Sequence, residues 1–269
     1  MILTLAPHEF SPEHVEYLKQ YQDFIRCLTI HNRELIMGVK DINSRYLITN
    51  DAHAVAVGMK CGKDMIGLTD GDMACKEIAS YCHQYQTEDQ QIIRNMDLNS
   101  TYTYLKVHHY ADGFKARIIK KSVMYHKESN VVLGISFNGY EIKLSSLFSL
   151  MPNYANLISK SNIAQQRVSK KKYSVNGISL TQYEYEICYL LTIGWGYGEI
   201  ADFLNKHNFD NKSTRNADTI KKVKNTICRK LGLFGHVSYL REMLMCFDVH
   251  IQAPCSILQY FSGSRQIDM

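Results

Sequence analysis

Apolar residues recur at three- and four-residue steps near the start of the chain. They are Val15, Leu18, Tyr21, Ile25 and Leu28. This spacing places them on one face of a helix and Pro12 suits a first turn, so we predict an amphipathic helix from residue 12 to about residue 31. The last four of these residues also fit a coiled-coil seam, but two heptads are few for a coiled coil. Packing against its own domain is the favoured interpretation, and dimerisation is the alternative.

Short strands are predicted between residues 35 and 140. Ile36–Lys40 and Tyr46–Thr49 flank Asp41–Ser44, a cluster of turn-forming side chains, and this arrangement indicates a hairpin. A helical region follows over residues 51–97, interrupted by a loop at residues 67–72. Three more strands are predicted at residues 101–109, 114–125 and 131–140. In the last strand an apolar face is expected from the alternating residues Leu133, Ile135 and Phe137.

Two strands, helices and then three strands is the order of a PAS domain. The segments that resemble this family are Val39–Asn50, Met65–Asp72 and Asp112-Gly113 before a long strand. The resemblance implies a PAS-like sensor domain over residues 34–141. It fixes no ligand, and the sequence requires no cofactor. His83 in the helical region is a lone histidine, which is more often a surface or core residue than a haem ligand.

The C-terminal part begins with clear helix signals. Thr181 and Glu184 have the spacing of a capping box, so a helix is predicted to start at residue 182 and to stop near Gly194. A second short helix is predicted over residues 197–204. The apolar positions of these two helices are Ile187, Leu190, Leu191, Ile200, Phe203 and Leu204.

The third helix of this part is predicted to run from its N-cap, Asn216, to about residue 231. Its apolar face consists of Ile220, Val223, Ile227 and Leu231. Its opposite, mainly cationic face consists of Asp218, Lys221, Lys222, Asn225 and Arg229. Basic side chains neutralise phosphates, and Arg and Asn can read base edges, so the pattern suits a DNA recognition helix. An ordinary surface helix with a solvated basic face is the alternative.

Positive charge is concentrated in the same part of the chain. The net charge is +5, with 16 Lys+Arg and 17 Asp+Glu in residues 1–159 but 15 and 9 in residues 160–269. Such asymmetry favours an anionic partner for the C-terminal part, such as nucleic acid.

Several coordinated positions in this part resemble the LuxR-type helix-turn-helix domain. They are Leu180-Thr181, Glu184, Leu191, Gly194, Glu199–Ala201, Leu204, Thr219–Lys221, Ile227 and Lys230–Gly232. The resemblance implies a four-helix DNA-binding domain whose third helix enters the major groove. The DNA-binding residues that follow from the helix and the resemblance are Thr219, Lys221, Lys222, Lys224, Asn225, Arg229 and Lys230. A fourth helix would pack through Val237, Leu240, Leu244 and Phe247.

The turn before the third helix departs from the family pattern. Fourteen residues separate Leu204 from Thr219, which is more than the family has there. A long surface loop costs little chain entropy, so both helices can still pack together. Whether the loop at residues 205–218 helps or hinders DNA docking is open.

These patterns predict an α+β protein: a PAS-like antiparallel sheet with helices, followed by an all-α four-helix helix-turn-helix domain. The predicted parts are residues 1–33 (N-terminal helix), 34–141 (PAS-like sensor), 142–173 (helical and basic linker), 174–250 (DNA-binding domain) and 251–269 (C-terminal tail). The eight scattered cysteines show no CxxC pair and indicate reduced thiols rather than a zinc site.

The favoured function is that of a cytoplasmic bacterial transcription regulator. It would bind double-stranded DNA as a homodimer and respond to a small molecule or a partner protein at the PAS-like domain. No apolar run approaches a membrane span, and no catalytic motif is evident. One alternative is a protein-interaction regulator in which the long turn has abolished DNA docking. An RNA binder is a weaker alternative, because the basic face lacks interleaved aromatic residues.

Overall fold

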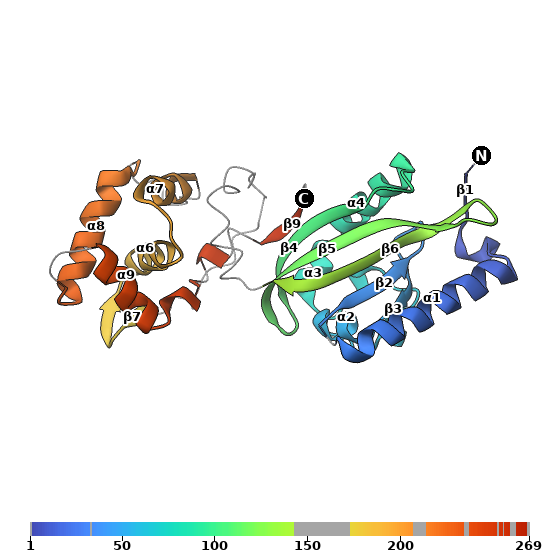
Figure 1. Ribbon diagram of the computed structural model, residues 1–269, viewed down its shortest axis with the longest axis horizontal. Helices are drawn as coiled ribbons and strands as arrows, with labels where there is room; N and C mark the ends of the chain where they lie inside the picture. The colour runs from blue at the N-terminus through green and yellow to red at the C-terminus, as the bar shows by residue number, and fades with distance from the viewer. Residues whose placement is uncertain are drawn as a thin grey trace. The chain divides into compact units, whose positions relative to one another are not determined.

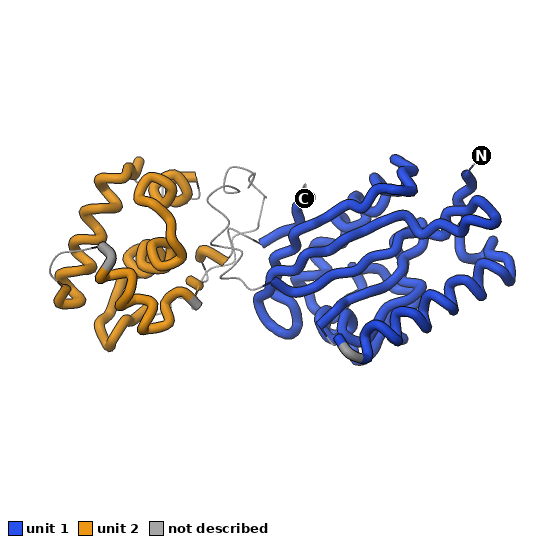
Figure 2. Tube along the Cα trace, in the orientation of Figure 1, with its two compact units in different colours: residues 1–142, 262–269 blue, residues 143–261 orange. Residues whose placement is uncertain are grey.

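The computed structural model describes residues 2–32, 34–142, 173–206, 214–233, 237–251, 253–254, 256–258 and 262–267. The chain forms two compact units, which Figure 2 colours separately. Unit 1 comprises residues 1–142 and 262–269, and unit 2 comprises residues 143–261. The helical and basic linker predicted over residues 142–173 lies almost wholly outside the described residues.

Unit 1 is built on one largely antiparallel sheet (Figure 1). Along its path the strands follow the order β3-β2-β6-β5-β4-β9, and β1 pairs in parallel with β6. The strands are β1 (Leu3–Thr4), β2 (Ile36–Lys40), β3 (Tyr46–Thr49), β4 (Tyr102–Tyr110), β5 (Gly113–His126), β6 (Val131–Ile142) and β9 (Gly263–Gln266). The predicted hairpin of β2 and β3 is confirmed, and the Asp41 carboxylate accepts from the backbone N–H groups of Asn43 and Arg45 in its turn.

Helices cover both faces of this sheet. On one face lie α2 (Asp51–Ala56), α3 (Lys76–Ser80), α4 (Cys82–Asn95) and the short turns η2 (Gly62–Met65) and η3 (Asp70–Asp72). On the other face lies α1 (Pro12–His31), whose Ile25 is buried among Met37, Val39 and Leu133. Leu18 and Tyr21 pack there too, whereas Val15 and Leu28 are exposed. The interpretation that α1 packs against its own domain is therefore confirmed for the middle of the helix.

One expectation about β6 is wrong. Leu133 packs with the α1 side of the sheet, whereas Ile135 and Phe137 pack on the side of α2 to α4. The reason is a β-bulge beside Gly134, which has a φ of +146° and interrupts the alternation of faces. A Cβ built on Gly134 would lie 1.9 Å from the carbonyl oxygen of Lys40, so only glycine fits there.

The described residues of unit 2 begin with a small hairpin, which the helices α6 to α9 follow. The hairpin pairs β7 (Tyr173–Val175) with β8 (Ile178–Leu180) around Asn176-Gly177, a turn that was not among the predicted elements. The helices are α6 (Gln182–Thr192), α7 (Tyr197–Lys206), α8 (Ala217–Lys230) and α9 (Val237–Cys246), followed by the short turn η6 (Val249–Ile251). The predicted capping box is present: Thr181 Oγ1 accepts from the N–H of Glu184, and the Glu184 carboxylate accepts from the N–H of Thr181.

The core of unit 2 lies where α6, α7, α8 and α9 meet. Among its buried residues are Ile187, Leu190, Ile200, Phe203, Ile220, Ile227, Leu240 and Leu244. Phe247, expected on the packing face of the fourth helix, is instead 39% exposed. Its N–H still donates to the carbonyl oxygen of Met243 as in a helix, but Phe247 lies beyond the last residue of α9 and its side chain is left partly in solvent.

The C-terminal segment was expected to be a tail, but residues 263–266 form a strand of unit 1. β9 lies beside β4 and pairs antiparallel with it (Figure 1). In this pairing Gly263 lies opposite Val107. The backbone groups of β4 would otherwise be unpaired at the sheet edge, and β9 satisfies them.

Within the described residues, no helix combines the length and apolarity needed to cross a membrane. No group of three or more His, Cys, Asp or Glu side chains in that same part of the chain is placed to hold a metal ion. The seven cysteines that the structure describes are all free thiols.

Candidate nucleic-acid interface and buried polar cavity

Helix α8 presents a cationic stripe to solvent. Lys221, Lys222, Asn225 and Arg229 are exposed, and at 100° per residue they occupy an arc of about 100° together with Asp218. The buried side of the helix consists of Ile220, Lys224, Ile227 and Cys228. Asn216 caps the helix by accepting from the N–H of Thr219 at 2.9 Å. The stripe is therefore held on a helix whose start and packing are both fixed.

Three of the predicted DNA-binding residues have other roles in the structure. Lys224 is only 5% exposed and faces the interior of unit 2, so its side chain lies away from the stripe. Lys230 pairs with the Glu184 carboxylate at 2.7 Å and thereby ties α8 to α6. The hydroxyl of Thr219 donates to the Asn216 side chain at 3.0 Å. Of the seven predicted residues, Lys221, Lys222, Asn225 and Arg229 keep their side chains available for a partner surface.

The salt bridge between α6 and α8 also perturbs a carboxyl group. Burial would raise the pKa of Glu184, but the Lys230 ammonium and two hydrogen bonds from Thr181 outweigh it, and the pKa of Glu184 is lowered. Glu184 thus remains charged and anchors α8.

The long turn between α7 and α8 is closed at its base. Asn205 Nδ2 donates to the carbonyl oxygen of Arg215 at 2.7 Å, and the N–H of Arg215 donates to Asn205 Oδ1 at 2.8 Å. Arg215 Nη1 also donates to the carbonyl oxygen of Leu204 at 3.3 Å, and its guanidinium lies 5.0 Å from the ring centroid of Tyr183. These contacts join the end of α7 to the start of α8 independently of the residues between them.

We expect Asn205→Ala to destabilise unit 2 by about 1–2 kcal/mol, because the variant lacks two partly buried hydrogen bonds at the base of the turn. Denaturant unfolding of the full chain, followed by a probe in unit 2, measures this change. Asn225→Ala, at an exposed position within α8, is the matched control and should be neutral or slightly stabilising. Equal stability of the two variants would show that the turn is not held by Asn205.

Unit 1 contains a second feature, a buried network of charged side chains between the sheet and α4. Its cations are Lys40, Lys106 and Lys121, and its anions are Asp70, Glu88 and Asp89. All six are between 1% and 7% exposed. Lys121 Nζ lies 2.6 Å from Asp89 and 2.9 Å from Glu88, and Lys40 Nζ lies 2.5 Å from Asp70 and 3.5 Å from Asp89. Three cations thus face three anions in the interior.

The members of this network are not equally well paired. Burial would lower the pKa of Lys40, but Asp70 and Asp89 outweigh it and raise that pKa. Burial would raise the pKa of Asp89, but Lys121 and Lys40 lower it to about 2. Lys106 differs, because burial prevails over the attraction of Glu88 and lowers the pKa of Lys106 to about 8. Its Glu88 partner is shared with Lys121, so Lys106 is the cation that the network holds least firmly.

A cavity of about 50 Å³ adjoins this network. It is lined by Lys40, Tyr46, His53, Asp70, Tyr85, Asp89, Lys106, Tyr110 and Lys121, together with six apolar residues. A single water molecule needs roughly 10–15 Å³ of such space, so the cavity admits a small polar guest. Burial lowers the pKa of His53 to about 3, so this imidazole is neutral. Charged side chains, a neutral histidine and tyrosines therefore line one small cavity.

The pKa of Lys106 makes stability depend on pH. Because its folded pKa of about 8 lies below the ordinary value of 10.5, the unfolded chain binds more protons between these pH values, and the contribution of Lys106 to stability rises with pH across that window. We expect Lys106→Met to remove this rise, which amounts to about 3 kcal/mol. Unfolding free energies from pH 7.5 to 10 measure it, with the exposed Lys127→Met as control. Parallel pH profiles for wild type and Lys106→Met would contradict the assignment.

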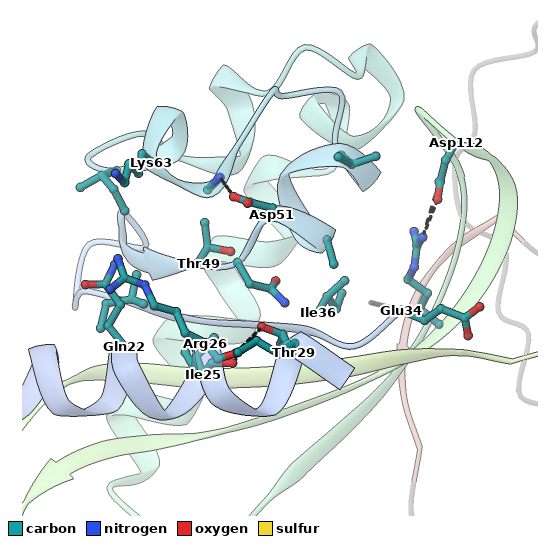
Figure 3. A pocket seen from close by; sticks show the side chains of 18 of the residues that line it. Gln22, Ile25, Arg26, Thr29, Glu34, Ile36, Thr49, Asp51, Lys63 and Asp112 are labelled. Carbon is teal, nitrogen blue, oxygen red and sulfur yellow. Dashed lines mark hydrogen bonds and ion pairs between the residues drawn. The ribbon is translucent and has the colours of Figure 1, made fainter. Parts of the chain in front are cut away.

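A larger hollow of about 630 Å³ lies between α1 and the β2–β3–α2 segment of unit 1. Figure 3 shows Gln22, Arg26 and Thr29 on α1, with Thr49, Asp51 and Lys63 across from them. The Asp51 carboxylate already accepts from the N–H of Gly62, and Asp112 pairs with Arg117 at 3.1 Å. The smaller cavity is lined by charged side chains that are themselves almost fully buried, so we take it as the better candidate for a ligand site.

The sequence patterns do not predict the buried network. Lys40, Lys106 and Lys121 lie in strands whose two faces are both covered, so the alternation of residues does not mark them as interior. One signal was present: Tyr104, Lys106, His108 and Tyr110 alternate with other residues along β4 and share its inner face. His108 and His109 point to opposite faces of β4, since His108 is buried and His109 is exposed.

No protein-family model matches the chain, and no curated protein matches it. Solved structures do. The Vibrio cholerae VqmA protein in a complex with ligand and DNA aligns with a TM-score of 0.57 and 19% identity, covering 91% of this chain and 97% of that one. A phage VqmA in complex with DPO aligns with a TM-score of 0.56 and 23% identity, covering 94% and 100%. The chain has the VqmA fold.

This likeness covers both units and confirms the predicted fold class, a PAS-like sheet unit combined with a helix-turn-helix unit. A third VqmA structure, described as a dimer without target DNA and as a LuxR-type receptor, aligns with a TM-score of 0.43 and 20% identity over 91% of this chain and 96% of that one. At these identities the VqmA fold is what the chain shares, and its chemistry has to be argued from its own residues.

Proposed function

We propose that this protein is a DNA-binding transcription regulator whose DNA binding is controlled by a small molecule at the PAS-like unit. The observation that carries the proposal is the cationic stripe Lys221, Lys222, Asn225 and Arg229 on a capped and packed α8. The same fold binds ligand and DNA together in the Vibrio cholerae VqmA complex. We assign residues 174–250 to DNA binding and residues 34–141 to sensing.

The chemistry of the stripe supports contact with duplex DNA. Lys221 and Lys222 supply cations for phosphates, and Arg229 and Asn225 supply donors in the geometry that guanine and adenine edges accept. Asn205 and Arg215 close the base of the enlarged turn, so the spacing of α7 and α8 does not depend on the inserted residues. The closed base supports DNA docking over the alternative in which the long turn has abolished it. Thr219 and Lys230 remain proposed contacts to the DNA backbone, although their side chains bond Asn216 and Glu184 in the free protein. Lys224 is left out because it is buried.

The chemistry of the cavity supports a small polar ligand. Lys106 is the least firmly held cation and offers a donor, while Asp70 and Asp89 offer acceptors in the same space. The phage VqmA structure contains DPO, and we propose that a small molecule is the signal here too. A regulator of this kind acts in the cytoplasm, where its DNA is.

Genomic footprinting with the full-length protein tests the proposal. We expect protected sites made of two half-sites separated by about one helical turn, because a symmetric dimer presents two α8 helices. Affinity for these sites should fall steeply with salt. A protein that protects no DNA, yet captures a partner protein from DNase-treated extract, would replace the proposal with the protein-interaction alternative.

A further inference from the structure

The residue at which the chain leaves the sheet of unit 1 and the residue at which it returns lie in the same row of paired residues across the sheet. The sheet register places Ile142, the end of β6, opposite Ala116, then Ala116 opposite Val107, and Val107 opposite Gly263, the start of β9. With strands about 4.8 Å apart, the exit and the return are about 14 Å apart. Unit 2 is therefore an insertion whose two ends are both joined to the same end of the sheet.

Side chains of α4 hold β9 in addition to the backbone ladder. Gln84 Nε2 donates to the carbonyl oxygen of Ser264 at 2.7 Å, and Ser264 Oγ donates to Glu88 Oε1 at 2.5 Å. The other oxygen of Glu88 lies 3.1 Å from Lys106 Nζ and 2.9 Å from Lys121 Nζ. One carboxylate thus joins the returning strand to two cations of the cavity wall.

We propose that β9 is a latch, through which the occupancy of the polar cavity sets how firmly the returning chain of unit 2 is attached to the sheet. A ligand atom that accepts a hydrogen bond from Lys106 takes one donor away from Glu88. The hydrogen bond from Ser264 to Glu88 then becomes stronger, and β9 is attached more firmly to the sheet. When Lys106 is bonded to Glu88 instead, the hydrogen bond from Ser264 to this carboxylate is weaker, and β9 is attached less firmly. The effect on DNA binding rests on the proposed function, whereas the link between cavity and strand does not.

Other residues of the charged network also influence how firmly β9 is attached. Asp70 binds Lys40, which also contacts Asp89, and Asp89 shares Lys121 with Glu88. Removing the charge of Asp70 moves Lys40 toward Asp89, releases Lys121 toward Glu88 and loosens the latch. Removing the Tyr46 hydroxyl, which donates to Asp70 at 2.6 Å, has the opposite sign, because Asp70 then draws Lys40 away from Asp89. Coupled hydrogen bonds of this kind respond to one another in a low-dielectric interior.

Hydrogen exchange on the full-length protein tests the latch, with amides of β9 compared with those of β5 and β6. We expect Ser264→Ala to speed β9 exchange roughly 10- to 100-fold, because the strand then lacks its hydrogen bond to a buried carboxylate. Asp70→Asn should speed it roughly 3- to 10-fold, and Tyr46→Phe should slow it. Gln266→Ala, at the exposed position of β9, is the matched control and should exchange like wild type.

Two results would overturn the latch. One is Ser264→Ala exchanging like Gln266→Ala. The other is faster amide exchange of β9 in Ser264→Ala without the opposite changes of β9 exchange in Asp70→Asn and Tyr46→Phe. In that case Ser264 would attach β9 to the sheet, but the cavity would have no influence on this attachment. Every variant is judged by the ratio of the amide exchange rate of β9 to that of β5 and β6. A variant that speeds exchange equally in all three strands has loosened the whole sheet and does not support the latch.

The effect of the latch on DNA affinity is measured separately. On the genomic fragments protected in footprinting, Ser264→Ala should bind at least roughly 3-fold more weakly than Gln266→Ala, because the returning end of unit 2 is then attached less firmly to the sheet. Equal affinities combined with different exchange rates would overturn the control of unit 2 by β9. If wild type binds no DNA, the proposed function fails while the exchange measurements still decide the latch.

Discussion

Replacing Lys221 and Arg229 together with alanine is expected to weaken DNA binding roughly 100-fold and to flatten its salt dependence. Both side chains are exposed on α8, less than three turns apart on one stripe. Removal of one phosphate-binding cation reduces the slope of log affinity against log salt by about 1, so the loss of Lys221 should lower the slope by about 1. Without the donors of Arg229, discrimination between base pairs should also fall by about 1–3 kcal/mol.

The measurement is fluorescence anisotropy on a footprinted fragment between low and moderate salt. Lys60→Ala with Lys127→Ala is the control, because both residues are exposed in unit 1 and their replacement changes net charge equally. Neither residue lies in the helix-turn-helix unit, so the control should keep wild-type affinity and slope. An α8 double variant that binds like this control would exclude the stripe as the DNA interface.

Replacing Asp89 with alanine is expected to cost about 3–5 kcal/mol of stability in unit 1. Asp89 is 1% exposed and lies 2.6 Å from Lys121 and 3.5 Å from Lys40, so its removal leaves buried cations without a counter-charge. The destabilisation should be smaller for Asp89→Asn, which keeps an acceptor for Lys121 but not the charge. Burial would raise the pKa of Asp89, but Lys121 and Lys40 outweigh it and lower the pKa to about 2. In the wild-type protein the stabilising contribution of Asp89 should therefore persist down to mildly acidic pH and be lost as the pH falls below about 4.

Denaturant unfolding with a probe in unit 1 measures both effects. Asp64→Ala, an exposed carboxylate of η2, is the control and should change stability by less than about 0.5 kcal/mol. Asp89→Ala matching that control would mean that the charged network does not hold the interior together. The two predictions are independent, since one concerns an exposed face of unit 2 and the other the interior of unit 1.

Local sequence signals predicted most of the elements and the polarity of α8. The capping box at Thr181 and Glu184 and the N-cap at Asn216 act within a few residues, so they can be read without the fold. The exposed positions of the stripe follow from helical periodicity alone. Periodicity could not tell that Lys224 is buried or that Lys230 is engaged, because both depend on how the other helices of unit 2 pack around α8.

The sequence by itself therefore determined a PAS-like order of strands and helices, and a capped helix with a cationic stripe near the C-terminus. Only the tertiary structure decided the rest. Lys40, Lys106 and Lys121 come from three separate strands and meet Asp70, Glu88 and Asp89 only when the sheet and α4 pack together. β9 has a partner strand more than 150 residues earlier in the chain, and no local pattern encodes that pairing. Contacts between residues distant in sequence depend on the closed fold, whereas caps and periodic faces depend on their immediate neighbours.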